Sequence, residues 1–169
     1  RFASVWAFQA WNMSYNISVQ IPDLPARWPW VRRGIELLRD EGLRYNPHNP
    51  QIYRELAWHF QHKMGADLDD AHWIYKRQWA YEMSFLLGDG RPDWDALINP
   101  RTPEQVEKSR ILKEIYKLDP AYMRKVDDTY GPLEWRLPEA HAIYWAMLGL
   151  DNDTAGEQRI QLRRVIYQS

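Results

Sequence analysis

Apolar residues recur along this chain at spacings of three and four, which is the period of an amphipathic helix. No stretch alternates apolar and polar residues for long enough to predict a strand, so we expect an all-α protein. We expect helices at residues 2–19, 28–45, 50–64, 69–87, 102–118, 120–131, 138–150 and 154–167.

Proline residues separate the helices at residues 43–60, "LRYNPHNPQIYRELAWHF". Pro47 prevents continuation of one helix, whereas the fixed φ angle of Pro50 suits the first turn of the next. The connection between them is short, which predicts an antiparallel or steeply packed helix pair.

Other helix ends are marked by capping residues. Thr102 with Gln105, and Thr154 with Glu157, have the spacing of a capping box, in which the side chains at the start of a helix satisfy its free N–H groups. Residues 88–101 are the one long turn-rich stretch, and we expect an irregular loop there.

One helix pair carries a recurring order of large and small residues. A large residue, a large–small pair and an aromatic residue on the first helix are followed by a small and an aromatic residue on the second: Tyr53, Leu56, Ala57, Phe60, Ala71 and Tyr75. The stretches "GLRYNP" and "IYKLDP" look like two copies of one helix ending, each closed by a proline. This order resembles the tetratricopeptide repeat, a helix–turn–helix unit of about 34 residues. The resemblance implies one domain over residues 1–169 of stacked antiparallel helix hairpins, irregular overall and best defined at about 34–80.

A looser resemblance rests on "AWNMSYNISVQ", "RWPWVRRGIELLRDEGLRYNP" and "WRLPEAHAIYWAMLGL". These stretches look like uncharacterised bacterial proteins of the planctomycete and verrucomicrobial group, which tend to carry an N-terminal membrane anchor. The chain begins at Arg1, and we interpret it as a fragment or processed form whose anchor would lie outside these residues. We therefore expect a soluble domain that is tethered to a membrane in the full-length protein or free of it.

Composition excludes several classes of function. The net charge of −1 gives no global attraction to nucleic acid, and the absence of cysteine excludes disulfides, thiol catalysis and cysteine-ligated zinc. No nucleophile elbow, phosphate-binding glycine loop or HExxH motif is present, so we expect no enzyme and no cofactor. His59, His62, His72 and Asp69 have a spacing that zinc could use, but a solvated helix face is the commoner interpretation and we predict no metal.

The ten tryptophans are the anomaly in composition. They are spread along the whole chain, which favours a role as large core residues over a clustered binding platform. The alternative function, a helical protein that acts on carbohydrate or cell wall, requires exposed tryptophans. Burial of Trp28, Trp30, Trp94 and Trp135 separates the two hypotheses.

The preferred function is a protein–protein interaction scaffold, or an accessory subunit of a larger complex, that binds a protein or peptide partner. Stacked hairpins leave a concave face lined by first helices. The candidate contact residues on the helix at 50–64 are polar positions beside its buried stripe: Gln51, Arg54, Glu55, His59 and His62. The closing helix offers a second set for an acidic partner: Arg159, Arg163 and Arg164.

Overall fold

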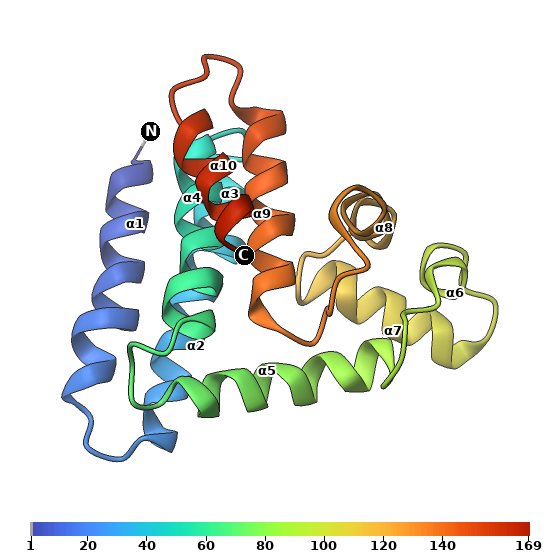
Figure 1. The fold of residues 1–169 in the computed structure, drawn as a ribbon, viewed down its shortest axis with the longest axis horizontal. Coiled ribbons are helices and arrows are strands. Elements are labelled where there is room, and N and C mark those ends of the chain that lie inside the picture. The colour runs from blue at the N-terminus through green and yellow to red at the C-terminus, as the bar shows by residue number, and fades with distance from the viewer. Residues whose placement is uncertain (1) are drawn as a thin grey trace.

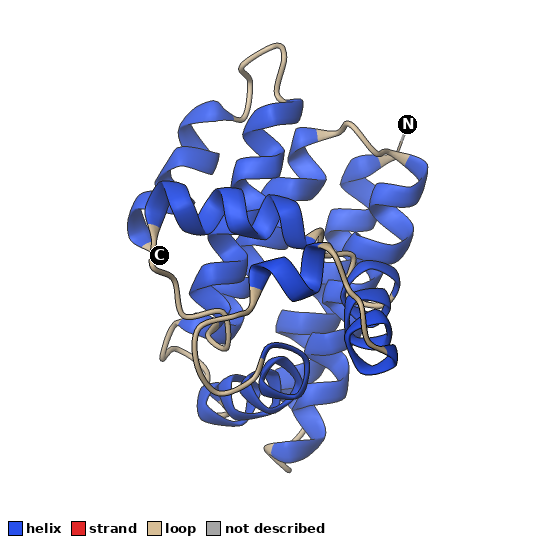
Figure 2. Cartoon of the chain, turned by 90° about the vertical axis from the view of Figure 1, so that its right-hand side faces the viewer, coloured by secondary structure: helices blue, strands red, loops and turns tan. Residues whose placement is uncertain are grey.

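The computed structural model describes residues 2–169, and all regular structure in this range is helical (Figures 1 and 2). The predicted all-α fold is therefore confirmed. None of the helices in the described range combines the length and the apolar character needed to cross a bilayer.

The first two long helices form an antiparallel pair. One consists of α1 (Ala3–Trp11), the π-helical η1 (Asn12–Ile17) and the short η2 (Ser18–Gln20). The other begins with η3 (Pro25–Arg27) and continues through α2 (Trp28–Glu36), η4 (Leu37–Gly42) and α3 (Leu43–Tyr45). The start of the first helix packs on η4 and its later part packs on α2, so the two run in opposite directions.

A central helix made of α4 (Pro50–Trp58) and η5 (His59–Gly65) continues the bundle. The Asn49 side chain caps its start by accepting a hydrogen bond from Gln51 N–H at 2.9 Å, and Pro50 occupies the first turn as predicted. Two C-terminal helices, α9 (Pro138–Asn152) and α10 (Arg159–Gln168), pack against α4 and against each other. In a linear array of repeats each unit contacts only its sequence neighbours. Here a helix from the end of the chain closes onto one from its first half.

The intervening helices form an arm beside this bundle. Helix α5 (His72–Leu87) crosses the base of the bundle, and α6 (Trp94–Ile98), α7 (Pro103–Glu114) and α8 (Pro120–Tyr130) follow at one side of the molecule (Figure 1). The predicted repeat at about 34–80 requires α5 to return along α4 as the second helix of a hairpin. Because α5 crosses the base of the bundle instead, the fold is already irregular within that repeat (Figure 1). Membership of the tetratricopeptide family stays a prediction.

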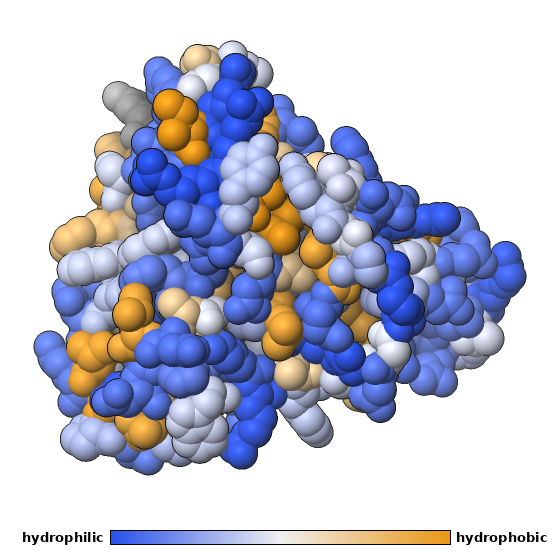
Figure 3. All heavy atoms as spheres, in the orientation of Figure 1, coloured by the Kyte–Doolittle hydropathy of each residue, from blue (hydrophilic) through white to orange (hydrophobic). Residues whose placement is uncertain are grey.

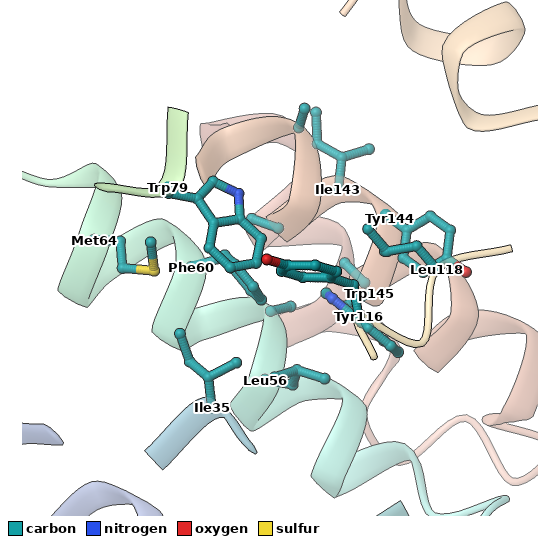
Figure 4. Close-up of a cluster of buried hydrophobic side chains, with 14 of the residues drawn as sticks. Ile35, Leu56, Phe60, Met64, Trp79, Tyr116, Leu118, Ile143, Tyr144 and Trp145 are labelled. Atoms are coloured by element: carbon teal, nitrogen blue, oxygen red, sulfur yellow. The ribbon is translucent and has the colours of Figure 1, made fainter. Parts of the chain in front are cut away.

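The six residues that carry the tetratricopeptide pattern are all buried. Leu56 and Phe60 from the central helix lie in one cluster with Trp79 from α5 and with Tyr144 and Trp145 from α9 (Figure 4). The Phe60 ring centroid lies 5.1 Å from that of Trp79. The core therefore joins the arm to the bundle through aromatic contacts.

Two local predictions need correction, and one is confirmed. The stretch 88–101 contains the short helix α6, because the Asp93 side chain accepts a hydrogen bond from Ala96 N–H at 3.1 Å and caps a turn. The second predicted capping box is wrong, since α10 begins at Arg159 and no side chain caps its start. Thr102 and Gln105 do form the predicted reciprocal cap of α7.

Most of the diagnostic tryptophans belong to the core. Trp28 and Trp135 are buried, and Trp94 is partly buried with its ring 5.9 Å from that of Trp135. Trp30 is 37% exposed. The prediction that tryptophans serve mainly as core residues is confirmed for these three, and Trp30 is the exception.

Candidate functional site

A groove between the central helix and α10 brings together members of both predicted contact sets. Its volume is about 300 Å³, and each helix contributes side chains spaced over two turns of one face. The lining residues are Arg54, Glu55, Trp58 and Gln61 from the central helix, and Gln161, Arg164, Val165 and Gln168 from α10.

The end of the groove is held by a side chain that reaches from one helix to the other. Gln61 donates its amide N–H to the Val165 carbonyl oxygen at 3.2 Å and to Ser169 Oγ at 3.3 Å. This contact links the two helices at one end of the groove, beside the packing of α10 on α9 and α4.

Charge in the groove is partly neutralised. Arg54 donates to the Glu55 carboxylate at 2.7 Å, and both side chains are half-buried. Arg164 is exposed and forms no ion pair within the described part of the chain. The same holds for Arg159 and Arg163, so α10 presents three unpaired cations, and the surface over it is largely hydrophilic (Figure 3).

Trp58 is the one aromatic residue that lines the groove, and its indole is already packed on other rings. The His62 imidazole stacks on it with centroids 4.4 Å apart, and the Tyr15 ring lies 5.1 Å away. Tyr15 also hydrogen-bonds His62 Nδ1 at 2.9 Å. These contacts hold the indole in place, so the groove has a pre-organised aromatic wall.

The prediction that His59 contacts a partner is wrong, because the structure buries this side chain completely. Its Nδ1 lies 2.7 Å from the Glu55 carbonyl oxygen, and burial lowers its pKa by disfavouring the charged ring. The sequence contains a signal for this burial: His59 lies on a stripe with Ile52, Leu56 and Lys63, at alternating spacings of four and three.

The other predicted residues lie outside the groove. Gln51 is at the first turn of α4, and His62 faces a second hollow beside Tyr15 and Lys63. Arg163 lies on another face of α10, and Arg159 lies against the turn at Gly156. Sequence reasoning missed the groove glutamines and Trp58, because each is an ordinary surface or core residue until α10 is placed beside α4.

The histidines do not gather around a common point. The residues that the structure describes contain no group of three or more histidine, cysteine or acidic side chains arranged to hold a metal ion. Asp69, one of the candidate ligands, instead accepts hydrogen bonds from Lys63 at 2.6 Å and from Tyr75 at 3.0 Å.

Comparisons of this chain with protein-family models, with curated proteins and with solved structures find no match.

Proposed function

We propose that this chain is a non-enzymatic interaction module that binds a peptide segment of a partner protein in the groove between α4 and α10. The observation that carries the proposal is that Arg54 and Glu55 meet Arg164 around one groove, although these candidates come from two predicted sets that lie far apart in the sequence, at residues 54–55 and residue 164.

The chemistry of the lining suits a peptide. Trp58 and Val165 supply apolar surface for a side chain, and tryptophan and arginine are enriched among residues that dominate binding energy. Gln161 and Gln168 are exposed and can donate to and accept from the main chain of a bound segment. The Glu55 carboxylate is paired with Arg54, which supports binding over acid–base catalysis at this site.

Sugar binding is the competing proposal, and the packing of Trp58 disfavours it. A sugar stacks on an open aromatic face, but His62 and Tyr15 already lie against this indole. Trp30, which is exposed, lies outside the groove.

The test is selection of displayed random peptides on the purified chain, followed by titration of enriched peptides against two charge-reversal variants. Arg164→Glu changes the groove, and Arg163→Glu makes the same change one residue away, on another face of the same helix. We expect Arg164→Glu to weaken peptide binding tenfold or more, since a hydrogen bond to a charged group contributes about 1.5–3 kcal/mol. We expect Arg163→Glu to leave affinity within about twofold.

Equal losses in the two variants would refute the groove as the binding site. Failure to enrich any peptide, together with binding of soluble oligosaccharides that quenches tryptophan fluorescence, would favour the sugar hypothesis instead.

A further inference from the structure

Another hollow, of about 400 Å³ and separate from the one beside Tyr15, lies where the bundle meets the linker between α7 and α8. Arg39, Asp40 and Arg44 reach it from η4 and α3, Lys117 from the linker, and Tyr53 and Trp145 form part of its wall. It shares no lining residue with the groove between α4 and α10.

The hollow is unusually basic for a protein whose net charge is −1. Its charged lining consists of three cations, Arg39, Arg44 and Lys117, and one carboxylate, Asp40, which leaves a net charge of +2. Within the described residues Arg44 and Lys117 form no ion pair. Two of the three cations therefore have no counter-ion among the residues that the structure describes.

Arg39 is fixed at the inner side of this cluster. Its side chain is only 6% exposed and donates from Nε and Nη2 to the two oxygens of Asp40, at 2.7 and 3.1 Å. The guanidinium carbon also lies 5.9 Å from the centre of the Tyr116 ring. Nη1 makes no hydrogen bond to any described residue, which leaves a donor of a rigid, buried guanidinium free for a ligand.

Lys117 reaches the hollow through a costly backbone conformation. Its φ angle is 56°, in the left-handed region that glycine or asparagine would occupy with less strain. The strained turn closes α7, and Leu118 N–H donates to the Leu112 carbonyl oxygen at 2.8 Å. A left-handed residue just past the last turn is a common way to end a helix, and here it brings Lys117 into the lining of the hollow.

We propose that this hollow binds a phosphate group carried by a small molecule with an apolar or aromatic body. A phosphate monoester is close to a dianion at neutral pH, which matches the net charge of the lining. Arginine and lysine donors recognise phosphate oxygens through charge-assisted hydrogen bonds. The stacked rings of Tyr53 and Trp145, 6.3 Å apart, with Leu43 and Leu148, offer apolar contact to the rest of the ligand.

The test is calorimetric titration of the whole chain at low salt with three probes: inorganic phosphate, phenyl phosphate and benzoate. We expect saturable binding of phenyl phosphate at one site, weaker binding of inorganic phosphate, and weakest binding of benzoate. Benzoate binding as tight as that of phenyl phosphate would overturn the assignment to phosphate. Absence of saturable binding of phenyl phosphate would overturn the site itself.

Variants locate the binding. Arg44→Gln and Lys117→Gln each remove one exposed cation, and each should weaken phenyl phosphate binding about tenfold. The matched control is Arg124→Gln, an exposed and unpaired arginine on α8 outside the hollow, which should bind as the wild type does. Circular dichroism verifies that each variant is folded. Equal weakening in the control would mean non-specific attraction and would refute the proposal.

Discussion

Gly34 is the position where the packing of the first two helices can be tested most directly. A Cβ atom placed on this residue of α2 would lie 2.9 Å from the carbonyl oxygen of Ala10 and would collide with the Ser14 hydroxyl on η1. Ordinary carbon contacts are about 3.5–4.0 Å. A side chain can rotate away from such a collision, but the Ala10 backbone cannot, so Gly34→Ala must push the two helices apart.

Two opposing effects set the magnitude for Gly34→Ala. Alanine favours a helix over glycine by about 1 kcal/mol. Overpacking costs about 1–3 kcal/mol, and contact with backbone places this site near the upper limit. We therefore expect a net loss of about 2 kcal/mol, which lowers Tm by about 4–8 °C in a chain of this size.

The assay is urea unfolding followed by circular dichroism, with Gly42→Ala as the matched control. Gly42 is also a buried helical glycine, but its added Cβ would meet Ile52 Cγ2 at an ordinary 3.4 Å. The control should be unchanged or more stable by up to about 1 kcal/mol. If Gly34→Ala is as stable as the wild type, the two helices do not approach as described.

Three further predictions concern other parts of the fold. Ala57→Trp should lower stability by about 3 kcal/mol or prevent folding, because Ala57 is fully buried; an unchanged melting temperature would place it outside the core. Asp69→Asn should remove part of the acid sensitivity of the fold. Burial alone would raise the pKa of Asp69, but hydrogen bonds, led by that from Lys63, lower this pKa on balance. The ionised Asp69 therefore stabilises the fold fully above its pKa in the unfolded chain, which is about 4, and this stabilisation is lost as the pH falls through its lower pKa in the folded chain. Urea titrations between about pH 2 and 6 should show a shallower decline for the variant, and equal slopes would contradict this. Lys117→Gly should raise stability by about 0.5–1 kcal/mol in thermal melts, because relief of the left-handed strain exceeds the entropy cost of glycine; destabilisation would mean that the lysine side chain contributes to the fold.

Helix positions could be predicted from sequence because their determinants are local. Pro50 starts a helix by its own ring geometry, and Thr102 with Gln105 caps another across a single turn. The burial of Leu56, Ala57 and Phe60 follows from a periodic stripe that any packed helix must cover. The failure at Thr154 shows the limit, since capping-box spacing alone does not decide whether a helix starts there.

The candidate sites depend on which helices meet, and this is decided by tertiary packing. The groove needs α10 beside α4, and the basic hollow needs the linker after α7 beside α3 and α9. Neither pairing can be predicted from local spacing, because many amphipathic helices have the same periodic apolar stripe. The pattern therefore does not say which two helices pack together. What selects among them is the fit of the core, such as Phe60 against Trp79 and the close approach at Gly34. The sequence by itself therefore determined where helices form and which stripe of each is buried. The three-dimensional fit of those stripes decided that Arg164 joins Arg54 in one groove and that α9 closes onto α4.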